Sequence, residues 1–296
     1  MPSLISFVIL LMIWLGSSLV AFIPLFFLDP WHAGRAILCF TLAPVLFCIS
    51  FPLIAGTLSW PFQNGIVPGK FPRDSTHPVY FRRRMFGLCW TQVYYFKPVY
   101  AVVLAIPALK RVVFRLFGYK GSLNFTTYPD TWIRDLPLLK IAEGAYLANR
   151  ATIGSNLVLT DGSILVDSVT IGKRSMVGHL CIIGTGVVLG DGVEIGMRSS
   201  IGIKVRIEDG ANIKPHCAIN HGTVIGKNAE VGIMSLVGVK CVIGDGVKLH
   251  AGSNIPNGTV LLTQRDVEQY FSSETSSLRK HRETLLNLIG ETQDNA

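Results

Sequence analysis

The sequence predicts a membrane-anchored parallel β-helix, made of an N-terminal transmembrane helical hairpin, interfacial helices, an all-β coil of six-residue repeats and a C-terminal helical cap. Three observations lead to this fold class. Two long uncharged segments lie near the N-terminus, basic residues are concentrated directly after them, and an aliphatic residue then recurs at every sixth position. The expected regions are two transmembrane helices in 1–60, a basic membrane-associated linker in 61–139, the β-helix in 140–260 and a helical tail in 261–296.

The two apolar segments predict the membrane anchor. Residues 4–28 and 36–58 contain no charged side chain. A helix rises about 1.5 Å per residue, so each segment is long enough to cross a hydrocarbon core of about 30 Å. A cleaved signal peptide would have a basic start and a shorter apolar core. We therefore expect an integral membrane protein whose partner is the lipid bilayer.

The distribution of basic residues predicts the orientation of this hairpin. The loop between the two segments has one basic residue, Arg35, whereas the chain after the second segment contains Lys70, Arg73 and the run Arg82–Arg84. Basic loops stay on the cytoplasmic side of a membrane. Both termini and the β-helix are therefore expected in the cytoplasm, at the inner (cytoplasmic) membrane if the source is bacterial.

Residues 85–118 are long enough for a third crossing, but Lys97, Pro98 and Pro107 interrupt them. A third crossing would also place the β-helix away from cytosolic cofactors. We therefore expect interfacial or re-entrant helices, with the arginine run and Lys110–Arg111 at the lipid headgroups. A third transmembrane helix is the alternative.

The net charge of +8 belongs to the first half of the chain. Residues 1–139 contain 12 Lys and Arg against 4 Asp and Glu, whereas residues 140–296 contain 15 of each. Basic residues beside apolar segments are typical of an anionic membrane surface. No motif that reads a nucleic-acid groove is present, so nucleic acid is not an expected partner. The six cysteines have no metal-type spacing and are expected to be reduced packing residues.

The second half of the chain has a period of six. All 20 residues at steps of six from Ile141 to Ile255 are aliphatic, eleven of them are followed by glycine, and a small residue usually stands two positions before each. This period fits neither a helix nor a hairpin meander. It predicts a prism of short parallel strands with three sides per coil, six coils and two further sides, and a height of roughly 30 Å. The unbroken register predicts that no loop interrupts the coils.

The repeat "[LIV]-G-x-x-[small]-x" over residues 141–260 resembles the hexapeptide-repeat, left-handed β-helix acyltransferase superfamily. This resemblance implies a left-handed coil, a homotrimer, and acyl-CoA or acyl-carrier protein as the donor in clefts between neighbouring prisms. A second resemblance covers about 66–145, where "GKFPRDSTHPVYFRRRMFG" and "LFGYKGSLNF" are similar to the membrane and β-helix portion of poly-lysine-synthetase-type nonribosomal peptide synthetases. The amide-forming chemistry of those proteins is not transferred, because the sequence leaves no room for an adenylation or carrier domain.

The segment "INHGTVIGKNAEVG" resembles a stretch of lipid A and sialic-acid-type hexapeptide acyltransferases in which a histidine follows an aliphatic residue by two positions. The resemblance implies that His221 is the general base that takes a proton from an acceptor hydroxyl or amine. A neutral imidazole suits this task because its pKa lies close to cytoplasmic pH. His216 and His179 are second-tier candidates for catalysis. The alternative interpretation makes His221 a turn residue that is hydrogen-bonded to the next rung.

Three functions follow from these patterns. The leading hypothesis is a membrane-anchored acyltransferase that moves an acyl group, most simply acetyl, to a membrane-associated glycan, lipid or peptide. The second is a non-catalytic trimeric platform that assembles partners at the membrane. The third is a metal enzyme, because His216 and His221 have the spacing of a histidine pair in γ-class carbonic anhydrases. No third ligand matches that site, so no metal is expected.

Residues 261–296 break the six-residue period. They predict one or two amphipathic helices that cover the open end of the prism, whose last rung would otherwise expose strand edges. The expected apolar anchors of this tail are Leu278, Leu285, Leu286 and Leu288.

Overall fold

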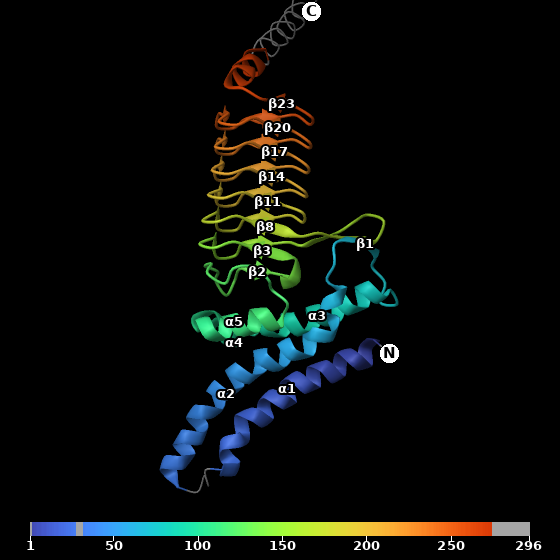
Figure 1. Cartoon of the computed structure of the whole chain (residues 1–296), viewed down its shortest axis with the longest axis vertical. Helices are drawn as coiled ribbons and strands as arrows, with labels where there is room; N and C mark the ends of the chain where they lie inside the picture. The colour runs from blue at the N-terminus through green and yellow to red at the C-terminus, as the bar shows by residue number, and fades with distance from the viewer. Residues whose placement is uncertain (1, 28–31, 274–296) are drawn as a thin grey trace, which may run out of the picture.

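The computed structural model describes residues 2–27 and 32–273. Figure 1 shows two long helices at one end, shorter helices lying across them, a tall stack of strands, and a final helix on top. The predicted order of a helical hairpin, intervening helices, a parallel β-helix and a C-terminal helix is therefore confirmed.

The helical hairpin consists of α1 (Pro2–Phe27) and α2 (Ala33–Ser59). Within the described residues these two helices, the second with the short η1 (Trp60–Gly65) that continues it, are the candidate membrane spans by length and composition. Large apolar side chains cover their outer surface, with Phe7 at 61% and Phe26 at 81% exposed. Such a contiguous apolar surface is unusual in a soluble monomer and fits contact with lipid.

The segment 85–118 contains no single long helix: most of it belongs to three separate helices, α3 (Pro78–Tyr95), α4 (Lys97–Ala105) and α5 (Pro107–Leu116). Pro98 and Pro107 stand in the first turns of α4 and α5, where a missing N–H is tolerated and the preceding helix must end. None of the three helices is a candidate span in the described chain. We call α3–α5 the helical platform.

The platform packs against the open base of the prism (Figure 1). The ring of Trp90 is fully buried, 5.0 Å from the ring of Phe117 and 5.8 Å from that of Tyr100. The Trp90 indole nitrogen donates a hydrogen bond of 2.7 Å to the carbonyl of Ile133 in the first strand of the prism. One hydrophobic core therefore runs from the helical hairpin α1–α2 through the platform into the β-helix.

The prediction that Lys110 contacts lipid headgroups is wrong. Its side chain is 9% exposed and donates hydrogen bonds to the carbonyls of Leu123 and Phe125, at 3.3 and 2.7 Å. Burial lowers the pKa of Lys110 to about 8. Arg83, the middle residue of the arginine run, is also buried, at 2% exposed. Both side chains point into the protein because the platform has a second packing partner, the base of the prism.

The prism has three flat sides of parallel strands, two of seven strands and one of six. The first side comprises β2 (Trp132–Ile133), β5 (Thr152–Ile153), β10 (Ile182–Ile183), β13 (Ser200–Ile201), β16 (Ala218–Ile219), β19 (Leu236–Val237) and β22 (Asn254–Ile255). The second comprises β3 (Leu139–Ile141), which follows η2 (Leu136–Leu138), β8 (Val169–Ile171), β11 (Val188–Leu189), β14 (Arg206–Ile207), β17 (Val224–Ile225), β20 (Val242–Ile243) and β23 (Val260–Leu261). The third comprises β4 (Tyr146–Leu147), β9 (Met176–Val177), β12 (Glu194–Ile195), β15 (Asn212–Ile213), β18 (Glu230–Val231) and β21 (Lys248–Leu249).

The prediction of uninterrupted coils is wrong, because a hairpin leaves the prism after its first complete turn. Ile183 pairs with Ile201, eighteen residues later, but Ile153 pairs with Ile183, thirty residues later. The twelve extra residues form β6 (Asn156–Val158) and β7 (Ser163–Val166), which pair antiparallel with each other. Strand β1 (Gly69–Pro72) pairs with β7 on its other edge. Two predicted core positions, Leu159 and Leu165, thereby lie outside the coil.

The small residues before each core position are explained by the turns. Ser175 and Thr223 are buried, and each hydroxyl donates to a backbone carbonyl fifteen residues later, at 2.6 and 2.7 Å. The glycine after a core residue is needed for a close approach between coils. A Cβ on Gly172 would lie 2.1 Å from the carbonyl oxygen of Gly190. The six cysteines are free thiols, and Cys89, Cys181, Cys217 and Cys241 are among the buried residues, as the packing interpretation predicted.

The top of the prism is covered by a helix over residues 264–273. Thr263 and Asp266 exchange hydrogen bonds at its start, which is the geometry of a capping box. The Gln264 side chain pairs with both backbone groups of Lys248 on the last rung of the third side, at 2.9 and 3.2 Å. The predicted anchors Leu278, Leu285, Leu286 and Leu288 lie outside the described residues.

Candidate functional site

The three predicted histidines lie at two different corners of the prism. His221 follows β16 of the first side by two residues, whereas His179 and His216 follow strands of the third side. All three side chains are exposed. His216 has a left-handed backbone, with φ of 61°, and is one of several residues that hold this conformation at a prism corner. The structure therefore separates His221 from the two second-tier candidates.

His221 makes a hydrogen bond that recurs throughout the prism. Its Nδ1 accepts the backbone N–H of Ile203 in the coil below, at 2.9 Å. The equivalent turn positions of other coils hold side chains that accept the same kind of bond from eighteen residues earlier: Asp191, Asp209, Asp245 and Asn257. A neutral imidazole that accepts at Nδ1 carries its proton on Nε2. In this arrangement His221 is a donor at Nε2. Its role as general base stays a prediction, and that role requires the hydrogen bond from the Ile203 N–H to Nδ1 to be broken.

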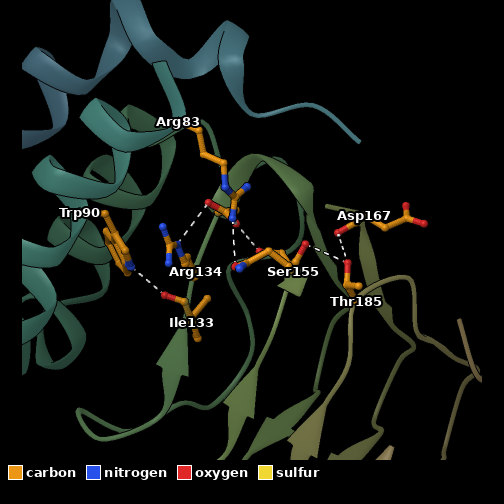
Figure 2. Close-up of polar contacts among 9 residues, drawn as sticks. Arg83, Trp90, Ile133, Arg134, Ser155, Asp167 and Thr185 are labelled. Carbon is orange, nitrogen blue, oxygen red and sulfur yellow. Dashed lines mark hydrogen bonds and ion pairs between the residues drawn. The ribbon is translucent and has the colours of Figure 1, made fainter. Parts of the chain in front are cut away.

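The hairpin leaves the prism at the corner on which His221 lies. We call the stacked turn positions Ser155, Thr185, Ile203 and His221 the hairpin corner. The Thr185 hydroxyl contacts the carbonyls of Ser155 and Asp167, at 2.8 and 3.3 Å, and these residues flank the two ends of the insertion (Figure 2). At about 4.8 Å per coil, His221 lies three coils, or about 14 Å, above Ser155.

A buried ion pair holds the base of this corner to the platform (Figure 2). Arg83 of α3 and Asp135, which precedes η2, are 2% and 0% exposed and form a direct ion pair. Arg83 Nη2 also donates to the Asn156 side chain at 3.0 Å, and the Ser155 hydroxyl donates to the Asp135 carboxylate. Arg134 Nε lies 3.8 Å from the other carboxylate oxygen. Burial lowers the pKa of Arg83, and the charge of Asp135 opposes that shift.

Sequence reasoning missed this network, although a signal was present. Arg83, Phe86 and Trp90 are spaced at i, i+3 and i+7, so all three lie on one helix face. The two aromatic residues indicate that this face is buried, and Arg83 is buried with them.

A cavity of about 400 Å³ opens beside the ion pair. Its walls are formed by the helical platform, the β-hairpin β6–β7 and the first turns of α1. Its lining residues are Ser6, Arg73, Tyr80, Arg83, Arg84, Met85, Gly87, Leu88, Thr91, Arg134, Asn156, Val158 and Ile164. The hairpin that interrupts the coils is therefore also a wall of this cavity.

Within residues 2–27 and 32–273 of one chain, no three His, Cys, Asp or Glu side chains are grouped to hold an ion. His216 and His221, whose spacing suggested a pair, follow strands of different sides.

Short parallel strands that recur every six residues on three sides, paired at a register of eighteen residues, define the fold. The chain has the hexapeptide-repeat β-helix fold. A family model described as the GMPPB C-terminal domain matches residues 165–276, which is less than half of the chain. No curated protein matches the sequence.

Solved structures with the same repeat are similar to parts of the chain. The acetyltransferase domain of PglB from Neisseria gonorrhoeae FA1090 has 21% identity and a TM-score of 0.32, over 40% of this chain and 55% of that one. PerB from Caulobacter crescentus, solved with CoA and GDP-perosamine, has 15% identity and a TM-score of 0.30, over 52% and 59%. A UDP-N-acetylglucosamine acyltransferase from Francisella novicida has 18% identity and a TM-score of 0.22, over 44% and 51%. This chain thus spans little more than half the length of these structures, and the likeness concerns the fold alone.

Proposed function

We propose that the protein is a membrane-anchored acyltransferase. It transfers an acyl group from acyl-CoA or an acyl-carrier thioester to a hydroxyl or amine of a membrane-associated glycan, lipid or peptide. The observation that carries this proposal is the hairpin β6–β7, which interrupts the β-helix and forms a wall of the cavity between the prism and the apolar helices. An uninterrupted prism would offer no such pocket for an acceptor within one chain.

The hairpin corner supplies the chemistry of this proposal. The acceptor hydroxyl or amine loses its proton to His221 and attacks the thioester carbonyl. The tetrahedral intermediate collapses, the C–S bond breaks, and the thiolate takes the proton back from the imidazolium. Stabilisation of the oxyanion by a backbone N–H of a neighbouring turn is part of this proposal, and the N–H of Ile203 becomes free for it once His221 releases that bond. His221 must first release the N–H of Ile203, because that bond occupies its Nδ1 lone pair.

The remaining parts of the proposal concern the assembly. We propose that α1 and α2 cross the bilayer, with the platform and the prism on the cytoplasmic side, because basic residues follow the second apolar segment. A homotrimer of prisms, with the donor between subunits, is proposed from the hexapeptide repeat.

The experiment compares two substitutions of His221. His221→Asn keeps an acceptor at this turn, since Asn257 accepts the N–H of Val239 at 2.7 Å in the equivalent position. His221→Ala removes both the acceptor and the imidazole. Full-length protein in lipid nanodiscs is given acetyl-CoA and a membrane lipid extract, and free thiol is measured. A catalytic imidazole predicts that both variants lose about 10²–10⁴-fold in rate.

The second candidate function is non-catalytic: a trimer of prisms that assembles partners at the membrane. It is favoured by one observation, that His221 performs the same turn contact as Asp191, Asp209, Asp245 and Asn257. It predicts wild-type behaviour for His221→Asn and a small loss of stability for His221→Ala. Wild-type turnover in His221→Asn would refute the catalytic role of His221.

A further inference from the structure

The cavity beside the ion pair is strongly cationic. Four of its lining residues are arginines, and no acidic residue lies among the described residues that line it. The Asp135 carboxylate is fully buried, does not line the cavity and is already paired with Arg83. A cavity with this charge excess favours an anionic ligand.

Buried guanidinium atoms in this wall are unsatisfied. Arg83 Nε and Nη1 and Arg134 Nε are buried, and none has a hydrogen-bond partner in the part of the chain that the structure describes. A buried donor without an acceptor costs about 1–3 kcal/mol. The carboxylate oxygen Asp135 Oδ1 is also buried without a hydrogen bond, 3.8 Å from Arg134 Nε, so the chain itself supplies an anion beside these donors.

The arginine geometry indicates the chemistry of that acceptor. Each guanidinium presents a planar fork of donors that matches the oxygens of a phosphate in two parallel hydrogen bonds. Arg83 is held rigidly by Asp135 and Asn156, and Arg84 donates to the Ser75 hydroxyl at 2.9 Å. Arg73 and Arg84 are exposed and Arg134 is 33% exposed, so these three guanidinium groups remain open to a group with several charged oxygens, whereas Arg83 is committed to Asp135.

The other walls indicate where the phosphate comes from. Met85 and Leu88 of α3, Val158 and Ile164 of the hairpin, and Ser6 near the start of α1 complete the lining. Ser6 belongs to an apolar helix long enough to cross a membrane, and Figure 1 shows the start of α1 lying below α3. The cavity is thus bounded on one side by the N-terminal end of α1. Lipid headgroups lie at this level if the helical hairpin α1–α2 spans a bilayer.

We infer that this cavity binds a phosphate group, as a monoester or diphosphate, carried by a lipid at the membrane surface. The arginine forks hold the phosphate oxygens, and the apolar walls accept the first part of the lipid. The further assignment of this lipid as the acceptor of the acyl group rests on the proposed acyl transfer. The binding itself is tested without any thioester donor, so failure of one does not imply failure of the other.

The experiment measures ligand-dependent thermal stability of the full chain in phosphatidylcholine nanodiscs. A ligand that binds only the folded protein raises its melting temperature. The probes are inorganic pyrophosphate in solution, phosphatidic acid in the bilayer as the phosphate monoester, and phosphatidylglycerol at equal surface charge. The variants are Arg134→Gln and Arg84→Gln. Arg111→Gln is the matched control, because Arg111 is exposed on the same platform and lines a separate groove with Trp60 and Gln63.

We expect phosphatidic acid to stabilise the protein more than phosphatidylglycerol does. Arg134→Gln and Arg84→Gln should each weaken its binding by about tenfold or more, as expected for loss of a charge-assisted hydrogen bond, whereas Arg111→Gln should not. Stabilisation by pyrophosphate as well supports a phosphate site open to soluble ligands, and stabilisation by phosphatidic acid alone assigns the site to lipid. Equal effects of the two lipids, or equal binding in all three variants, would overturn the inference.

Discussion

Neutralising Asp135 should destabilise the junction between platform and prism far more than neutralising an exposed carboxylate. Asp135 has a left-handed backbone, with φ of 53°. Asparagine accepts this conformation readily, so Asp135→Asn changes the charge without adding backbone strain. The substitution leaves the guanidinium of Arg83, 2% exposed, without a counterion.

The magnitude follows from the burial of the pair. Removing one partner of a buried ion pair costs about 3–5 kcal/mol, which corresponds to a fall in melting temperature of roughly 5–15 °C for a protein of this size. Asp161→Asn is the matched control, because Asp161 pairs with Lys70 at 2.6 Å while both side chains are more than half exposed. Exposed pairs contribute about 0–1 kcal/mol.

The assay is thermal unfolding of full-length protein in nanodiscs, followed by tryptophan fluorescence. Trp90 is a suitable reporter because its indole bonds to Ile133, next to the ion pair. The double variant Arg83→Met with Asp135→Asn should be less destabilised than the sum of its single variants, because neither charge is then left unpaired. Equal melting temperatures for Asp135→Asn and Asp161→Asn, or additive effects in the double variant, would refute this reasoning.

Two further predictions concern stability at either end of the prism. Burial lowers the pKa of Lys110 from 10.5 to about 8. Between these values the unfolded chain holds a proton that the folded chain has lost, so stability should rise with pH by up to about 3 kcal/mol. Lys110→Met should remove this part of the slope, as measured by unfolding between pH 7 and about 10.5, and an unchanged slope would contradict the assignment. At the other end, Gln264→Ala should speed hydrogen exchange at the Lys248 amide, which donates to the Gln264 side chain, and leave the amide of Glu230 on an interior rung unchanged. Equal exchange at Lys248 in both proteins would show that Gln264 does not cap the edge.

The repeat was predictable from the sequence, but the hairpin within it was not found. Its twelve residues are two complete hexads, so Leu159 and Leu165 stay in phase with the core although both lie outside it. Period alone cannot detect such an insertion. A local signal was present in "LVLTDGSILV", where Asp161–Gly162 stands between two apolar runs, as is typical of a β-hairpin turn.

The candidate site was only partly predictable for a related reason. From the sequence, Arg83 and Lys110 are expected at the membrane surface, because charge after an apolar segment usually lies there. Their burial depends on the platform packing against the prism, a contact between segments more than fifty residues apart for Arg83 and Asp135. The sequence predicts that His221 is either a turn residue or a general base. Its bond to Ile203 shows the turn role and does not test the role as a base.

Transfer of labelled acetyl from acetyl-CoA into a membrane lipid extract tests the central claim most directly. The account predicts that wild-type protein in nanodiscs moves label into the organic-soluble or glycan fraction, and that Arg134→Gln slows this transfer while Arg111→Gln does not. No protein-dependent transfer from acetyl-CoA or from acyl-carrier thioesters, by a protein that folds and binds phosphatidic acid, would contradict the acyltransferase proposal and favour the assembly platform.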